Sequence, residues 1–338
     1  MKEIFVSVIV PIKELSYSLL YENLPAFEKQ DYKHFEVIIL PNEQKLYDLT
    51  LIKKYPWLRI IPTGKVTRPA QKRDIGASRA KGELLAFLDD DAYPTPTWLS
   101  DGVQSFSRSD VAAVGGPGMV PPHGSLWEKV FDGILTTFIG SGSYVYRFIP
   151  KTKRFVDDYP SMNFFVRKKV FEKVGGFNND YWPGEDSKLC NDIVYKEKKR
   201  IFYNPRVVVY HHRRSSLSHF LRQHGNYGFH RGAFFAQGDR NSTRITYFVP
   251  SYLTLYLTIL VLFTPLLVQH PILYAISALP FLMYALLIAA IFFHTLFRSK
   301  NLIVSFASAI TLVLMHVTYG ILFFIGFIKG KTKQNIYG

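Results

Sequence analysis

The octapeptide Leu84-Leu85-Ala86-Phe87-Leu88-Asp89-Asp90-Asp91 joins five apolar residues directly to three carboxylates. An apolar run of this length, closed by acidic residues and Pro94, predicts a buried strand that ends in an acidic turn. Adjacent carboxylates repel one another, so a bound cation would stabilise them. A hard divalent ion that bridges a diphosphate would do this. A solvated acidic turn is the alternative.

Other apolar runs precede this strand, at residues 4–10, 35–40 and 58–61. The segments between them are polar, and residues 15–29 have a helical pattern. This alternation predicts an α/β fold with a mainly parallel sheet. Such sheets bind ligands beyond the carboxyl ends of their strands. The residues at those ends are Pro11, Glu14, Pro41, Asn42, Glu43 and the three aspartates.

A more mixed pattern follows residue 103. Strands are predicted at residues 112–116 and 206–210, and helices at residues 164–174 and 187–198. Residues 126–139 form a third helix with one broad apolar face. That face would pack either on the sheet or on a membrane surface.

The C-terminal third is hydrophobic. Residues 245–297 and 302–328 contain no Lys, Arg, Asp or Glu, and a span needs about 20 apolar residues. We therefore predict an integral membrane protein, with residues 1–235 as a soluble domain. Residues 236–338 would form a membrane region with about three helices, near 247–268, 272–297 and 302–328.

Charge and targeting features narrow the partners and the compartment. The net charge of +15 suits anionic lipids and phosphate-bearing substrates. No groove-reading motif accompanies it, so nucleic acid is not expected as a partner. The first residues resemble a strand rather than a signal peptide, and the single cysteine, Cys190, fits a reducing compartment. The soluble domain is therefore predicted to be cytoplasmic.

The membrane topology is open at this stage. Three crossings would put Lys329, Lys331 and Lys333 outside, against the positive-inside tendency. Either the tendency fails for this short tail or one hydrophobic segment is re-entrant or interfacial. Pro250, Pro265 and Pro280 make broken segments plausible.

Several short motifs occur in a characteristic order. They are Ser7-Val8-Ile9-Val10-Pro11, Pro69-Ala70-Gln71-Lys72-Arg73-Asp74, Gly175-Gly176-Phe177, Gly184-Glu185-Asp186 and Val209-Tyr210-His211-His212, together with the acidic octapeptide. In this order and spacing they resemble the inverting family 2 glycosyltransferases, over about residues 4–235. The resemblance implies a GT-A fold, which is related to the Rossmann fold.

The resemblance implies a donor site with a metal ion. Asp89 and Asp91 would be the "DXD" pair that holds Mn²⁺ or Mg²⁺ on the donor diphosphate, and His211 would complete the metal site. The donor itself would lie against Asp89, Asp90, Pro11, Glu14, Arg73, Asp74 and Asn42. The family usually has Asn where Asp74 stands, and Pro41-Asn42-Glu43-Gln44 replaces its usual Asp-Asp-Gly-Ser turn. A UDP-sugar is the favoured donor.

Four further residues complete the predicted chemistry. Asp186 would be the general base for the acceptor hydroxyl, supported by Glu185; capping of the following helix is the alternative role for this pair. The segment with Arg222 and Gln223 would close over the diphosphate, or bind anionic lipid, or do both.

Together these features predict sugar transfer to a lipid-linked saccharide acceptor at the cytoplasmic membrane face. A polyprenyl-phosphate glycosyltransferase is the enzyme alternative, and its anionic acceptor hardly needs a base. A non-catalytic sugar- or lipid-binding membrane protein on the same fold is the other.

Overall fold

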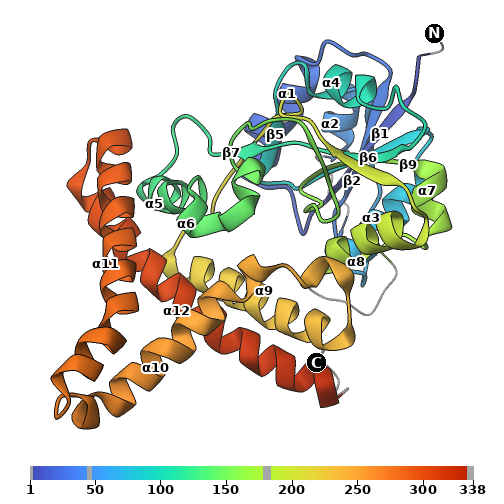
Figure 1. The fold of residues 1–338 in the computed structure, drawn as a ribbon. Helices are drawn as coiled ribbons and strands as arrows, with labels where there is room; N and C mark the ends of the chain where they lie inside the picture. The colour runs from blue at the N-terminus through green and yellow to red at the C-terminus, as the bar shows by residue number, and fades with distance from the viewer. Residues whose placement is uncertain (1–2, 44–47, 178–183, 333–338) are drawn as a thin grey trace. The chain divides into compact units, whose positions relative to one another are not determined.

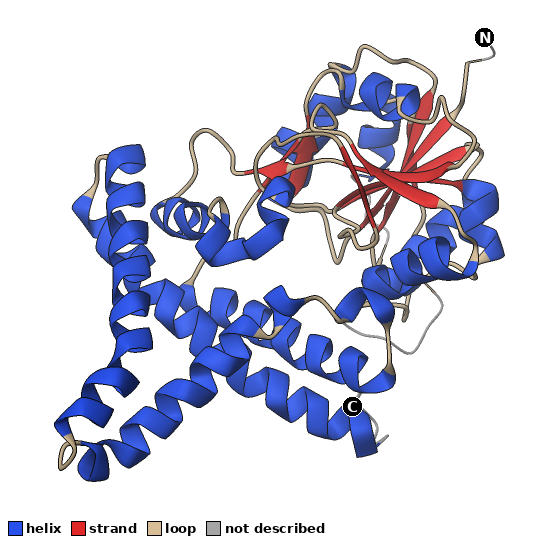
Figure 2. Cartoon of the chain, viewed as in Figure 1, coloured by secondary structure: helices blue, strands red, loops and turns tan. Residues whose placement is uncertain are grey.

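The computed structural model describes residues 3–43, 48–177 and 184–332 (Figure 1). The chain divides into two compact units. The sheet unit contains Met1–Pro121 and Tyr146–His212, and the helical unit contains Pro122–Val145 and Arg213–Gly338. Strands occupy the first unit and long helices the second (Figure 2). Lys333 of the predicted basic tail lies outside the described residues.

The sheet unit is built on an eight-stranded sheet in the order β3-β2-β1-β4-β9-β6-β10-β8. The strands are β1 (Val6–Pro11), β2 (Phe35–Leu40), β3 (Leu58–Ile60), β4 (Leu84–Leu88), β6 (Val111–Gly115), β8 (Arg154–Val156), β9 (Asn163–Arg167) and β10 (Arg200–Tyr203). The first four strands pair in parallel, as do β6 and β10, whereas β9 and β8 run antiparallel to their neighbours. The predicted mainly parallel sheet is therefore confirmed.

Helices and a small second sheet complete this unit. The helices are α1 (Leu24–Glu28), α2 (Asp48–Lys54), α3 (Pro69–Arg79), α4 (Trp98–Gln104), α7 (Lys168–Lys173) and α8 (Glu185–Asn191), with π-helices at Leu19–Asn23 and Asp192–Lys196. β5 (Ala92–Pro94), β11 (Val209–His211) and β7 (Gly118–Met119) form the three-stranded sheet in the order β5-β11-β7. Every residue of β1, β2 and β4 is buried, as expected for strands covered on both faces.

The prediction of a helix over residues 164–174 is wrong in its first half. Residues 163–167 form β9, which pairs with both β4 and β6, and only Lys168–Lys173 is helical. Phe164, Phe165 and Val166 are all buried. An apolar run that is buried on both faces has no period-2 signature, so periodicity alone does not distinguish it from a helix.

The helical unit contains α5 (Leu126–Leu135), α6 (Phe138–Ser141), α9 (Leu217–Gln237), α10 (Val249–Leu267), α11 (Pro271–Ser299) and α12 (Leu302–Thr332). The last three are long and apolar enough to cross a membrane, in agreement with the predicted positions. The predicted single helix at 126–139 is two helices that meet at Thr136 and Thr137. The apolar face of α5 packs on α11 and α12: Gly133 lies against Thr295, and Ser308 Oγ donates to Val130 O at 3.1 Å.

Candidate active site

Two carboxylates and an imidazole meet where β4 ends. β5 follows the acidic turn and pairs antiparallel with β11, which sets His211 opposite Ala92. His211 Nε2 therefore lies 3.1 Å from Asp91 Oδ1. One ligand atom from each of Asp89, Asp91 and His211 lies within 4.8 Å of the others. This donor set could hold a metal ion, because carboxylate oxygens and an imidazole nitrogen are both common metal ligands.

The guanidinium of Arg73 connects this group to a second acidic pair. Arg73 comes from α3, is 5% exposed, and places Nη2 2.7 Å from Asp89 Oδ1. Its Nη1 lies 3.4 Å from Glu185 Oε1. A buried arginine cannot lose its charge, so it balances two carboxylates that would otherwise repel each other. The predicted metal ligand Asp89 and the predicted catalytic pair are thus held close to one cation.

Glu185 and Asp186 begin α8. Gly184 precedes them with a φ of 122°, a conformation that side chains disfavour. Burial and, to a smaller extent, the charge of Asp186 together raise the pKa of Glu185 to about 7, although Arg73 partly opposes them. Asp186 accepts from the backbone N–H of Ser187 at 2.8 Å and from that of Ser161 at 3.4 Å. These two bonds hold its carboxylate at the first turn of the helix.

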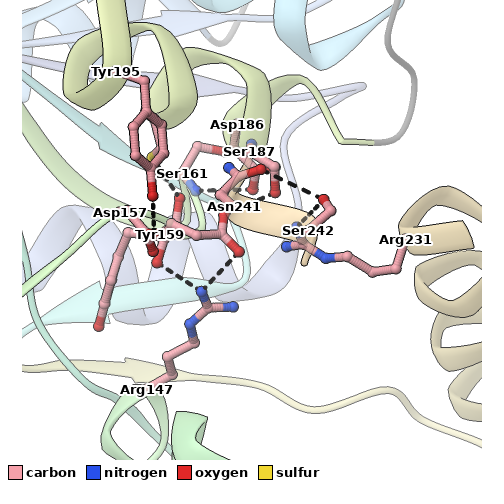
Figure 3. Close-up of polar contacts among 12 residues, drawn as sticks. Arg147, Asp157, Tyr159, Ser161, Asp186, Ser187, Tyr195, Arg231, Asn241 and Ser242 are labelled. Carbon is pink, nitrogen blue, oxygen red and sulfur yellow. Dashed lines mark hydrogen bonds and ion pairs between the residues drawn. The ribbon is translucent and has the colours of Figure 1, made fainter. Parts of the chain in front are cut away.

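A polar network in the sheet unit begins at Ser187, the residue after Asp186 (Figure 3). Ser187 Oγ donates to Asp158 Oδ1 at 2.8 Å, and Asp158 is only 2% exposed. Arg147 Nη2 lies 3.2 Å from the other carboxylate oxygen of Asp158 and donates to its backbone carbonyl at 2.7 Å. The sequence analysis did not single out Asp158 or Arg147. The Asp157-Asp158 pair before Tyr159 was the available signal.

A buried lysine joins the ends of two strands. Lys72 is 1% exposed and donates to Leu40 O at 3.1 Å, to Ile12 O at 2.5 Å and to Asn42 Oδ1 at 2.5 Å. Burial lowers its pKa, and the charge of Asp90 opposes that shift. The predicted donor residue Asn42 therefore uses its amide oxygen on Lys72, a contact that the sequence analysis missed. Lys72 stood inside a quoted motif, but no role was assigned to it.

The other predicted donor residues have different surroundings. Pro11 is the buried last residue of β1, and Glu14 is exposed in the loop that follows. Asp74 Oδ1 accepts from the backbone N–H of Phe177 at 2.8 Å, and burial raises its pKa to about 6. Asp74 thus holds the turn at Gly176, whose φ is 65°.

Arg222 and Gln223 lie on α9 in the helical unit. Arg222 is exposed, and Gln223 Nε2 donates to Tyr227 Oη at 3.0 Å. Closure of this segment over a diphosphate remains a prediction.

Comparison with known proteins gives matches over much of the chain. A family model described as "Glycosyl transferase family 2" matches residues 7–175. Glycosyltransferase AglE of Haloferax volcanii is 29% identical over 201 residues, which cover 56% of this chain and 62% of AglE. The dolichyl N-acetyl-alpha-D-glucosaminyl phosphate 3-beta-D-2,3-diacetamido-2,3-dideoxy-beta-D-glucuronosyltransferase of Methanococcus voltae is 22% identical over 250 residues, which cover 70% of this chain and 76% of that protein.

A solved structure supports the fold. The mannosyltransferase PcManGT from Pyrobaculum calidifontis, in complex with GDP-Man and Mn²⁺, superposes with a TM-score of 0.55 at 16% identity. The superposition covers 96% of this chain and 86% of that one. The predicted GT-A-like architecture with a helical C-terminal segment is therefore confirmed.

Proposed function

Because this chain belongs to glycosyl transferase family 2, we propose that it transfers a sugar from a nucleotide-sugar donor to a lipid-linked saccharide at the cytoplasmic face of a membrane. The reaction is metal-dependent and inverts the anomeric centre. One observation carries the proposal: Asp89, Asp91 and His211 lie within bonding reach of a single ion. Residues 1–235 carry the catalysis, and residues 236–338 hold it at the membrane.

The metal site explains the acidic turn. Asp89, Asp91 and His211 would hold Mn²⁺ or Mg²⁺, and the ion would neutralise charge on the departing diphosphate. The close contact of Asp89 with the Arg73 guanidinium, at 2.7 Å, indicates that this carboxylate favours a cationic neighbour. Pro11, Glu14, Asn42, Asp74 and Asp90 belong to the donor side of the site, and a UDP-sugar is the first donor to test.

The proton of the acceptor goes to Asp186. Its carboxylate is oriented by the backbone N–H groups of Ser187 and Ser161, and a hydroxyl attacks efficiently only when such a base takes its proton. Glu185, with a pKa of about 7, is partly protonated at neutral pH. Its supporting role rests on geometry: Glu185 Oε1 lies 3.4 Å from Arg73 Nη1, and Arg73 also holds Asp89.

A lipid-linked saccharide fits this arrangement better than a bare lipid phosphate. The name of the Methanococcus voltae relative specifies a sugar already attached to dolichyl phosphate, so that its acceptor offers a hydroxyl. The helical unit has three candidate spans that would keep this chain beside such an acceptor. A phosphate acceptor is already deprotonated at neutral pH, so it would need no general base at Asp186.

The test uses the full-length protein in nanodiscs with a panel of UDP- and GDP-sugars, and measures nucleoside diphosphate release with Mn²⁺, with Mg²⁺ and with EDTA. We expect release with one donor class, loss of release with EDTA, and loss in Asp91→Asn. Asp110→Asn is the matched control, because Asp110 is a surface residue paired with Arg108. Metal-independent release, or equal release by the two variants, contradicts the metal site. No release with any donor contradicts catalysis.

A further inference from the structure

α9 and α12 lie side by side with their backbones in contact (Figure 1). A methyl group on Gly228 or Gly232 of α9 would collide with a backbone carbonyl oxygen of α12, and one on Gly326 would collide with a carbonyl oxygen of α9. Small residues four positions apart allow this approach. The C-terminal half of α12 therefore occupies the same depth in a membrane as α9.

α9 is too polar for the interior of a bilayer. Its polar residues include Ser218, His219, Arg222, Gln223, His224, Asn226, His230 and Arg231. Arg222, His219 and Asn226 are exposed, and ionisable side chains avoid lipid unless a partner or a water-filled cavity receives them. α9 therefore stays at the membrane surface, and so does the half of α12 beside it.

The beginning of α12 is also tied to polar elements. Just before it, Arg298 Nη2 lies 2.8 Å from Asp132 Oδ2 of α5. Asp132 Oδ1 lies 3.5 Å from Arg213 Nη2, and Arg213 is the residue at which the chain finally leaves the sheet unit. At the other end, Gly330 packs on Ala233 near the end of α9. α12 thus begins just after a charged cluster, and its other end packs on α9.

The length of α12 agrees with a position at the membrane surface. Its 31 residues rise about 46 Å, well beyond the hydrocarbon core of about 30 Å.

The face of α12 turned away from α9 is a continuous apolar stripe. Its exposed residues, at helical spacing, are Ile303, Phe306, Ile310, Leu314, Ile321, Ile325 and Ile328. A helix with one covered face and one apolar face is suited to the boundary between headgroups and acyl chains.

α10 contacts α12 near its own start. Thr254 Oγ1 lies 3.4 Å from His316 O, and Gly320 packs against Pro250 and Thr254. Further along, Tyr256 Oη donates to Ser277 O of α11 at 2.7 Å. α10 and the first part of α11 therefore form a hairpin that leaves α12.

We propose that α12 lies along the membrane surface, with its apolar stripe in the acyl chains of a lipid bilayer, and that only the α10–α11 hairpin goes deeper. The hairpin returns to the side from which it started. Lys329 and Lys331 then lie on the side from which the chain enters at Arg213, and the conflict with the positive-inside tendency disappears. This inference goes beyond the proposed function and does not depend on it.

The test measures depth along α12 in the full-length protein. Single nitroxide labels replace Ile303, Leu314 and Ile328 in a Cys190→Ser background, in liposomes of phosphatidylcholine and phosphatidylglycerol, and oxygen and nickel collision rates give the depth of each label. We expect three similar depths. A crossing helix would instead put the label at Leu314 far deeper than the other two, and that profile overturns the proposal. Tyr252 and Val261 on α10 and Val268 directly after it are the matched series, and their depths should differ.

A second measurement does not depend on the serine background. Cys190 is fully buried, so a membrane-impermeant maleimide reports on an introduced cysteine. In sealed vesicles of one orientation, Lys331→Cys should react from the same side as Lys65→Cys, a surface position of the sheet unit. Reaction of Lys331→Cys from the opposite side overturns the proposal, because α12 would then cross.

Discussion

Replacing Glu185 by glutamine should stabilise the protein at pH 8 and have little effect at pH 5. The carboxyl is 7% exposed, and its pKa of about 7 stands above the ordinary 4.5 because burial and Asp186 disfavour its charge. The folded state therefore holds this proton more tightly than the unfolded chain does. Rising pH between about 4.5 and 7 destabilises the wild-type protein, and the cost is fully present above the folded pKa.

The size of the effect follows from the two pKa values. A rise from 4.5 to about 7 corresponds to about 3 kcal/mol at pH 8 and to less than about 1 kcal/mol at pH 5. Glutamine removes this cost, which already includes the attraction to Arg73, and Arg73 keeps its contact with Asp89 at 2.7 Å. The net gain at pH 8 should therefore be about 1–3 kcal/mol, or a rise in melting temperature of roughly 2–10 °C.

The assay is thermal unfolding of the full-length protein in detergent micelles, at pH 5, 6, 7 and 8. Glu172→Gln is the matched control, since Glu172 is an exposed residue of α7 and surface substitutions usually change stability by less than about 0.5 kcal/mol. The difference between Glu185→Gln and wild type should grow with pH. The raised pKa of the buried Glu185 carboxyl is refuted if the stability difference is the same at pH 5 and pH 8. It is also refuted if the variant is less stable than wild type at pH 8.

Four further outcomes are expected. Asp186→Asn should lower turnover by about 10²–10⁴-fold with little change in donor affinity by calorimetry or in melting temperature; normal turnover would favour a phosphate acceptor instead. Asp158→Asn should lower the free energy of unfolding in urea by up to about 3 kcal/mol, because it removes the buried carboxylate that pairs with the half-buried guanidinium of Arg147, and an unchanged value contradicts that role. Gly232→Val should lower the melting temperature, since its side chain would meet the backbone of α12; an unchanged temperature argues against the close helix contact. The chain should remain in the membrane pellet after alkaline carbonate washing, and release without detergent would exclude an integral anchor.

The local sequence pattern was sufficient to predict strands that consist of one continuous apolar run. The strands at 35–40 and 84–88 were predicted to the residue, because apolar runs closed by Pro41 and by Asp89 leave little choice of boundary. The meeting of Asp91 with His211 was expected only from the family resemblance, which placed His211 at the metal site.

The sequence pattern did not predict side-chain contacts between residues that are far apart in the sequence. Asp158 meets Ser187 across 29 residues, and Lys72 meets the end of β1 across 60. Nothing in the local sequence predicts either pairing, because both depend on how the sheet is completed. Asp74 illustrates the same limit: its motif did not predict that its carboxylate holds the turn at Phe177, and its contact with the donor stays a prediction.

The packing of α5 on α11 and α12 imposes an order on biogenesis. Ser308 contacts Val130 across 178 residues, so at roughly 5–20 residues per second the apolar face of α5 waits about 10–35 s for its partner during synthesis. Phe131 and Ile134 on that face are fully buried once docked and would be open to water until then. A nascent chain that stops before α11 should therefore expose the apolar face of α5 after the sheet has folded. Protein quality control would recognise this exposed apolar face.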